Sequence, residues 1–126
     1  HIGFNYRCPN VNAAIGCAQM ENIEDYITDK RKTAMEYAEF FKDSDINYIS
    51  EPENCFSNYW LNAILLPTPE DRDNFLEETN SNGVMTRPIW VLLHRLEYLD
   101  DPKHGNLENS IFIEQHLVNI PSSVRL

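Results

Sequence analysis

The hydrophobic pattern between residues 10 and 41 has the period of an α-helix. Apolar side chains recur there every three or four residues, which places them on one helix face, at Val11, Ile15, Ala18, Ile23, Tyr26, Ile27, Ala34, Tyr37, Ala38 and Phe41. The pattern predicts one long helix, or two joined by a kink. Pro9 and Asn10 suit its start, because proline lacks an amide donor that the first turn leaves unused and asparagine caps free amides. Gly16 costs about 1 kcal/mol relative to alanine, so either a segment packs closely there or the cost is tolerated.

The two faces of this helical region predict different surroundings. A solvated charged surface is favoured over a binding patch for the outer face, which carries Asp29, Lys30, Arg31, Lys32 and Glu36. The apolar face is larger than the small sheet predicted below can cover. We therefore expect the N-terminal helix to pack on a segment absent from this chain.

The pattern changes after residue 45 to short apolar runs that predict strands. Ile46 to Ile49 is a candidate, and Tyr59 to Leu66 is a stronger one because it is rich in aromatic and branched residues and ends at Pro67. Val84 to Arg87 predicts a further strand that Pro88 halts, and Leu117 to Ile120 a final one.

Helix signals separate these strands. Thr68 as cap, Pro69 in the first turn and the following acids predict a helix start. That helix should run to about Asn80 and close at Asn82 and Gly83, which tolerate positive φ. A loop over residues 100–105 precedes a last predicted helix from about Asn106 to His116. The order predicts an α/β sandwich with the helices on one face of a small sheet.

Composition and charge narrow the function classes. The chain has 126 residues, 42% of them hydrophobic, and 20 acidic against 10 basic side chains give a net charge of -10. Such a chain can bury a sizeable core. The acidic balance argues against binding to nucleic acid or to an anionic membrane.

Cysteine usage and the chain start add two expectations. Cys8, Cys17 and Cys55 form an odd set without a CxxC pair, which favours a reducing cytoplasm and small core or loop residues over nucleophiles. No apolar run is long enough to span a bilayer. Because the chain opens on His1 without a signal peptide, we expect a fragment.

The residues alone point to only two candidate sites. His94, His104 and His116 lack metal-ligand spacing, so no metal site is predicted, and His116 is expected to be packed or exposed on the last helix. Residues 3–10 place Asn5 and Arg7 just before a helix, where they could present donors to an anion, although a loop pinned by its own side chains is the leading alternative. Residues 86–94 place Arg87 and His94 where they could flank a pocket, but a buried Trp90 with incidental polar neighbours is equally compatible.

Several blocks of the sequence together resemble one enzyme family. The stretch NYRCPNVNAAIGCAQME over residues 5–21 closely resembles the NYRxPNxNAAxGxAQLE segment of the DegT/DnrJ/EryC1/StrS aminotransferases. The resemblance continues through residues 29–31, through GVMTRPIW at residues 83–90 with His94, and through NIPSS at residues 119–123. These blocks cover nearly the whole chain in the family's order. The AIGCAQ and NIPSS wording is most similar to the branch acting on UDP-linked 4-keto-6-deoxy sugars in legionaminic-type nonulosonic acid pathways.

The resemblance implies a pyridoxal-phosphate enzyme of fold-type I, a cytoplasmic homodimer with its active sites at the subunit interface. Such enzymes transfer an amino group, here expected from glutamate, to a nucleotide-linked keto sugar. The chain matches the family's C-terminal part, so residues 1–44 would be the helical connection leaving the large domain and residues 45–126 the small α/β domain. The family's Schiff-base lysine and most phosphate-binding residues lie upstream. The resemblance therefore implies no catalytic residue here and an inactive isolated chain.

By position, the resemblance also assigns binding residues. Asn5 resembles the residue that reaches the cofactor phosphate of the other subunit. Tyr6 and Arg7 resemble neighbours that shape this loop and approach the phosphate-rich end of the substrate. Arg87 and His94 resemble residues near the substrate mouth. Cys8 stands where the family often has methionine or leucine, a mild departure.

Two other interpretations remain open at this stage. One is a standalone, non-catalytic interaction domain derived from the same family, whose exposed helix face binds another protein. The second is an unrelated α/β domain with chance similarity, which predicts no long N-terminal helix followed by a small sheet.

Overall fold

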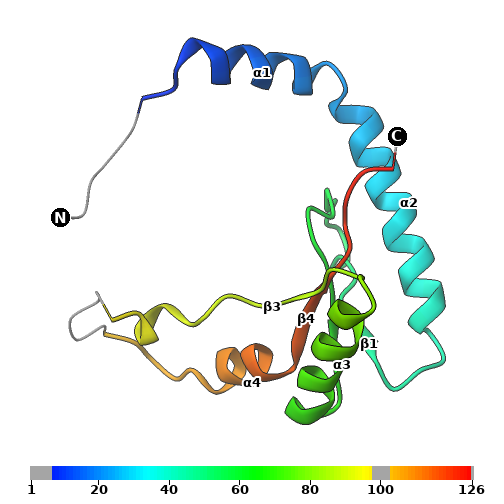
Figure 1. The fold of residues 1–126 in the computed structure, drawn as a ribbon, viewed down its shortest axis with the longest axis vertical. Helices are drawn as coiled ribbons and strands as arrows, with labels where there is room; N and C mark the ends of the chain where they lie inside the picture. The colour runs from blue at the N-terminus through cyan, green and yellow to red at the C-terminus, as the bar shows by residue number, and fades with distance from the viewer. Residues whose placement is uncertain (1–6, 98–102, 126) are drawn as a thin grey trace.

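The sheet is small, antiparallel and built from segments far apart in the sequence. The computed structural model describes residues 7–97 and 103–125. Its strand order is β1-β2-β4-β3, with bounds Asn47–Tyr48, Asn62–Leu65, Leu117–Ile120 and Arg87–Pro88 in that order. The central pair is β2 and β4, and Ile64 lies opposite Val118. Together with the flanking helices, this arrangement is the α/β class that the sequence predicts (Figure 1).

One face of this sheet carries the hydrophobic core. The buried cluster consists of alternate residues of β2 and β4 and of the positions that follow them, which a strand turns to the same side: Ile64, Leu66, Val118 and Ile120. Tyr37 and Phe41 from α2 pack against it, as do Phe75 and Leu76 from α3. Two helices therefore share one sheet face, as the sequence predicts.

The N-terminal helical region is two helices. Helix α1 spans Asn10–Met20 and α2 spans Ile23–Phe41, with a break at Glu21 and Asn22. There the Asn22 side chain donates to the Ala18 carbonyl at 3.0 Å. The kinked alternative is thus confirmed, and the two helices point in different directions (Figure 1).

The predicted cap at Asn10 is wrong. Pro9 holds the cap position in an extended conformation, and no side chain caps the helix. Asn10 is already the first helical residue, so its side chain cannot reach back to the free amides as a cap residue does.

Helix α3, Pro69–Ser81, starts and ends where local signals predict. The Thr68 hydroxyl accepts a hydrogen bond from the Asp71 amide at 3.1 Å. At the other end Gly83 adopts φ +77°, and its amide donates to the Asn80 carbonyl at 3.0 Å. A positive φ suits glycine, because a side chain is strained in this conformation.

Strands β1, β2 and β3 are shorter than predicted, whereas β4 has the predicted bounds Leu117–Ile120. Tyr59 has φ +45°, which excludes it from a strand, so β2 starts only at Asn62. The predicted strand from Val84 to Arg87 is wrong at both ends, because the Val84 amide donates to Thr79 of α3 and Pro88 pairs with Val118. Proline is tolerated there because β3 is an edge strand.

The short 3₁₀ helix η1, which follows β3, and helix α4, which precedes β4, extend away from the sheet (Figure 1). Helix η1 spans Leu93–Arg95 and α4 spans Glu108–His116. Glu114 of α4 ties them together, since its carboxylate accepts from the Leu92 amide at 3.1 Å and from the Arg95 guanidinium. His116 is packed, at 8% exposure, and its ring stacks on Phe112.

Candidate functional site

A cavity at the β3 edge of the sheet brings together two of the blocks singled out in the sequence. Its volume is about 420 Å³, within the ~300–1,000 Å³ of typical ligand pockets. We call it the Arg87 cavity. It is lined by residues just before β2, in and around β3, and at and after the end of β4, and these include Trp60, Arg87, Trp90, Asn119 and Ser123. The antiparallel pairing of Arg87 with Asn119 explains why these distant segments meet.

Two stacked indole rings form one wall of this cavity. The ring centroids of Trp60 and Trp90 lie 6.1 Å apart with planes 23° from parallel. Trp60 is 66% and Trp90 is 65% exposed. The alternative of a buried Trp90 is therefore wrong, and most of this aromatic surface is open to a partner or ligand.

Arg87 supplies the positive charge of the cavity. Its side chain is exposed, and one guanidinium nitrogen lies 3.5 Å from the Met85 sulfur. No acidic side chain is among the residues that line the cavity in the described part of the chain. In a chain of net charge -10, this combination favours an anionic ligand at this place.

The other predicted site residues are not part of this cavity. His94 lies on η1, half-buried, with its ring centroid 5.0 Å from that of His104. Arg7 is exposed at the start of the described chain, before α1. Asn5 and Tyr6 lie outside the described residues. The structure thus joins Arg87 to Trp90 and residues 119–123, and it leaves His94 and Arg7 elsewhere.

The charged face of α2 binds the loop that carries Trp60, contrary to the predicted solvated surface. Arg31 donates to both carboxylate oxygens of Glu51, at 2.7 and 2.9 Å, and to the Ser57 carbonyl at 2.7 Å. Its guanidinium lies 4.0 Å from the centroid of the Phe56 ring. Lys30 donates to the Trp60 and Ser122 carbonyls. Residues of α2 therefore fix the loop and the segment after β4 together.

These contacts set the ionisation of the groups involved. Hydrogen bonds from Arg31 and from the Ser57 amide lower the pKa of Glu51 to about 2. The same carboxylate raises the pKa of Arg31. Burial lowers the pKa of Lys30, against the opposing charge of Asp29. Glu51 is therefore ionised at neutral pH, where its carboxylate holds the Arg31 guanidinium.

Ser122 links the far side of the cavity to the buried end of β2. Its hydroxyl accepts from the Asn62 amide at 2.7 Å and donates to the Ile120 carbonyl at 2.7 Å. The Asn62 side chain is 1% exposed and accepts from the Tyr48 hydroxyl at 2.6 Å. Sequence reasoning missed this network and Trp60, since only the NIPSS wording and an aromatic residue near a predicted strand pointed to them.

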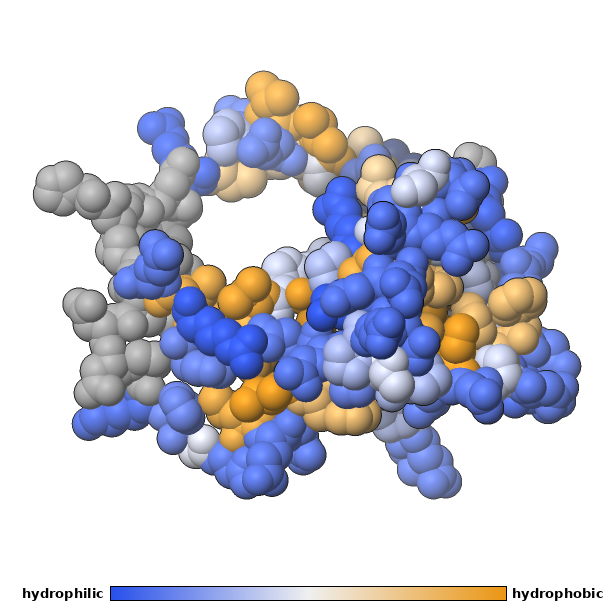
Figure 2. Space-filling view, turned by 60° about the horizontal axis from the view of Figure 1, so that its bottom comes forward, coloured by the Kyte–Doolittle hydropathy of each residue, from blue (hydrophilic) through white to orange (hydrophobic). Residues whose placement is uncertain are grey.

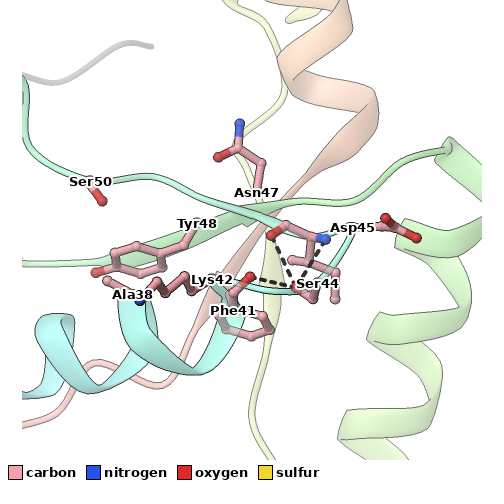
Figure 3. Close-up of a pocket in the computed structure, with 9 residues that line it drawn as sticks. Ala38, Phe41, Lys42, Ser44, Asp45, Asn47, Tyr48 and Ser50 are labelled. Atoms are coloured by element: carbon pink, nitrogen blue, oxygen red, sulfur yellow. Dashed lines mark hydrogen bonds between the residues drawn. The ribbon is translucent and has the colours of Figure 1, made fainter.

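Two further cavities contain none of the predicted site residues. One, of about 700 Å³, lies between the α1–α2 junction and the segment that carries Asn58 and Trp60. Another, of about 320 Å³, lies where α2 ends and β1 begins (Figure 3). In the second, the Ser44 hydroxyl donates to the Phe41 carbonyl at 2.8 Å, so its polar groups hold the turn.

Two further features were sought in the described ranges 7–97 and 103–125, a group of metal-ligating side chains and a membrane-spanning helix. No group of three or more His, Cys, Asp or Glu side chains there could hold a metal ion. None of the helices in this part is both long and apolar enough to cross a membrane. Cys8, Cys17 and Cys55 are free and exposed, so Cys17 lies on a helix surface and not in a core or loop.

Comparison with known proteins identifies relatives over the whole chain. Residues 1–126 match the DegT/DnrJ/EryC1/StrS aminotransferase family. The chain is 35% identical over 123 residues to GDP-perosamine synthase of Escherichia coli O157:H7, covering 96% of this chain and 33% of that protein. It is 30% identical over 126 residues to GDP-perosamine synthase of Vibrio cholerae, covering 34% of that protein. The chain therefore spans about a third of the length of these relatives.

Solved structures share the fold. The aminotransferase PseC of Helicobacter pylori, involved in pseudoaminic acid biosynthesis, superposes with a TM-score of 0.84 at 18% identity, over 100% of this chain and 35% of that one. The sugar aminotransferase CalS13 of Micromonospora echinospora gives 0.83 at 16% identity, over 98% of this chain and 33% of that one. An Escherichia coli GDP-4-keto-6-deoxy-D-mannose-3-dehydratase with bound hydrated PLP gives 0.75 at 23% identity, over 96% and 33%.

Proposed function

Because the chain belongs to the DegT/DnrJ/EryC1/StrS aminotransferase family, we propose that it is the C-terminal part of a pyridoxal-phosphate-dependent aminotransferase. The full-length protein would transfer an amino group, from glutamate, to a nucleotide-linked keto sugar. The observation that carries this proposal is the family match over residues 1–126 with relatives about three times longer. Residues 1–44 would leave the large domain and residues 45–126 would form the small domain.

The Arg87 cavity supports a role at the substrate end of the active site. Arg87 offers a planar fork of donors to a phosphate or carboxylate, and the open indole surface beside it offers apolar contact. His94 would act from η1 at the mouth of the site. Asn5 would hold the cofactor phosphate of the partner subunit, with Tyr6 and Arg7 toward the substrate phosphates.

The positions of the lysines agree with the proposal that the cofactor-binding lysine lies in another part of the full-length protein. Lys30 donates to two backbone carbonyls, and the Lys42 Nζ lies 3.6 Å from a carboxylate oxygen of Glu39. Neither Lys32 nor Lys103 is among the residues lining the Arg87 cavity. Pyridoxal phosphate, when bound, supplies the electron sink for amino transfer. The residues of this chain fit binding and orientation at its edge, and the lysine that the cofactor needs would come from the rest of the protein. The isolated chain should therefore be inactive.

The names of the relatives support a proposal about the wider setting. GDP-perosamine synthases and a pseudoaminic acid aminotransferase are among the similar proteins. We propose a place in cell-surface polysaccharide or nonulosonic acid biosynthesis, as a cytoplasmic homodimer. In such a homodimer, an active site at the subunit interface would let Asn5 reach the cofactor that the partner subunit binds.

The test is an amino-transfer assay of the full-length protein with pyridoxal phosphate, glutamate and a panel of GDP-, UDP- and dTDP-linked 4-keto-6-deoxy sugars. We expect an amino sugar nucleotide and 2-oxoglutarate in equal amounts, detected by mass spectrometry. Arg87→Ala should lower kcat/KM at least tenfold through KM. No amine product with any member of the panel contradicts the proposal, and the absence of any sugar product at all favours the interaction-domain alternative.

A second candidate reaction is sugar dehydration. The chain is 25% identical over 122 residues to GDP-4-keto-6-deoxy-D-mannose 3-dehydratase of Escherichia coli O55:H7, covering 90% of this chain and 31% of that protein. The same assay separates the two reactions, since the product of a dehydratase has lost a ring hydroxyl and carries no amino group. The 35% identity to a GDP-perosamine synthase favours amino transfer.

A further inference from the structure

We propose that Lys30 of α2 is a positioning residue for the Arg87 cavity. Its ammonium group bridges the ends of β2 and β4 where their pairing stops, and so places Trp60 and the segment after β4 relative to one another. This inference rests on the proposed function, in which the cavity lies at the substrate end of the active site. Lys30 acts from outside, since it lines the neighbouring cavity of about 700 Å³ and is not among the described residues that line the Arg87 cavity.

The pairing of β2 with β4 stops just before the cavity. Its last pair is Asn62 opposite Ile120. An unbroken antiparallel ladder would bring Trp60 opposite Ser122 two residues further along each strand, but residues 60 and 61 form a bend. At the last pair the Ser122 hydroxyl already enters the backbone bonding, because it accepts from the Asn62 amide and donates to the Ile120 carbonyl. Another group must therefore hold the two chains together beyond this point.

The Lys30 ammonium group joins the two residues of this unformed pair. It donates to the Trp60 carbonyl at 3.4 Å and, at a shorter distance, to the Ser122 carbonyl. An ammonium group has three donors, so it can serve both carbonyls at once, and hydrogen bonds from a charged donor are stronger than neutral ones. One side chain thereby connects backbone groups that lie 30 and 92 residues from it along the chain.

Neighbouring side chains of α2 hold the same segments one at a time. Arg31 donates to the Ser57 carbonyl at 2.7 Å, on the side of the loop before β2. The Tyr37 hydroxyl donates to the Pro121 carbonyl at 3.1 Å, on the side of β4. Of these three side chains, Lys30 contacts both sides. Loss of the Lys30 ammonium group should therefore loosen the link between the segments while each stays anchored to α2, so the fold should persist.

The link affects the Arg87 cavity because both of its ends lie in the lining. Trp60 and Ser122 line the cavity, and the Trp60 ring stacks on Trp90 with centroids 6.1 Å apart. Trp60 is 66% exposed, so its own packing contributes little to holding the ring in that place. Without the bridge, a ligand must order the two segments as it binds, and this cost lowers its affinity.

The experiment compares variants of the full-length protein by circular dichroism and by steady-state kinetics. Two stacked indoles give a coupled circular-dichroism band, and its loss in Trp60→Phe assigns the band to this pair. Lys30→Met removes the ammonium group and keeps an unbranched side chain; it should weaken the band and raise KM for the keto-sugar nucleotide about tenfold with kcat unchanged. Lys30→Arg keeps a charged donor and should restore both. Lys32→Met, at an exposed lysine of the same helix, is the matched control and should change neither.

Lys30→Gln keeps a neutral donor and guards against misfolding of the methionine variant, with thermal unfolding as the fold check. An unchanged coupled band in both variants overturns the inference, whether or not the protein transfers amino groups. In a protein that does transfer them, an unchanged KM in both variants overturns it too, even where the band weakens or kcat falls. A weakened band in a protein without amino transfer supports the bridge and contradicts the proposed function.

Discussion

At the scale of single residues, the charged face of α2 shows what a sequence pattern leaves open. Helical spacing identifies Lys30 and Arg31 as lying away from the apolar face, but their partners lie 20 to 92 residues further along the chain. Periodicity carries no information on such distant groups. The prediction of a solvated face was therefore wrong for these two residues, while Lys32 is exposed as expected.

Glu51 makes this network sensitive to acid. Its pKa in the folded protein is lowered to about 2, below that of an unpaired glutamate near 4.3. A lowered pKa adds stability that is complete above pH ~5 and is lost as the pH falls from there toward 2. We predict that Glu51→Gln lowers the urea midpoint of the full-length protein at pH 7, and that this difference shrinks steadily below pH 5.

The control is Glu53→Gln, a substitution of an exposed glutamate in the same loop, which should leave the urea midpoint unchanged at both pH values. A Glu51→Gln deficit of the same size at pH 7 and pH 3 would show that the carboxylate charge does not stabilise the fold.

At the scale of secondary-structure elements, local sequence signals predicted the start and end of α3, but they did not predict which strand residues pair with one another. Thr68, Pro69 and Gly83 act within a few residues of one another, and α3 ends at Ser81 against a predicted Asn80. The strands depend on partners up to 58 residues away, such as Asn62 opposite Ile120. Nothing in the local sequence shows that Pro88 pairs at an edge or that Tyr59 turns out of the strand.

Gly83 offers a test of this local control. Its φ is +77°, and no neighbouring atom lies within 4 Å of the place that a Cβ would take, so Gly83→Ala is strained by the backbone alone. We predict a loss of about 1 kcal/mol in the free energy of unfolding, measured by urea denaturation. Gly105→Ala, at a glycine with open space and no positive φ, should show no loss. Equal effects of the two substitutions would contradict the strain argument.

At the scale of the whole molecule, the structure separates residues that the sequence analysis had grouped into one candidate site. The sequence analysis named Arg87 and His94 together, but only Arg87 lines the cavity with Trp90, while His94 lies on η1 outside it. Asn5 and Tyr6 lie outside the described residues, so their roles stay predictions. If another domain or subunit completes the site, as we propose, the contacts within this chain alone do not reveal the roles of these residues.

The uncovered helix α1 is the clearest example. It has no buried residue, and its apolar side chains stay open, with Val11 70% and Ile15 58% exposed. In Figure 1, α1 stands away from the sheet, and in Figure 2 the segment at the top of the view carries hydrophobic residues, drawn in orange, on its surface. A stable soluble protein rarely leaves such a helix open. We therefore still expect that another segment covers α1.

Substitution at Ile15 tests that coverage. If the rest of a longer protein packs on α1, Ile15→Gln removes a buried aliphatic side chain and should lower the free energy of unfolding of the full-length protein by about 2 kcal/mol. Lys32→Gln, at an exposed position of α2, is the control and should have no effect. Hydrogen exchange of the α1 amides gives a second measurement, since a covered helix exchanges more slowly than one in open solvent. Rapid exchange of α1 together with an unchanged unfolding free energy in Ile15→Gln would contradict coverage, and would favour a free helix face of the kind that the interaction-domain alternative requires.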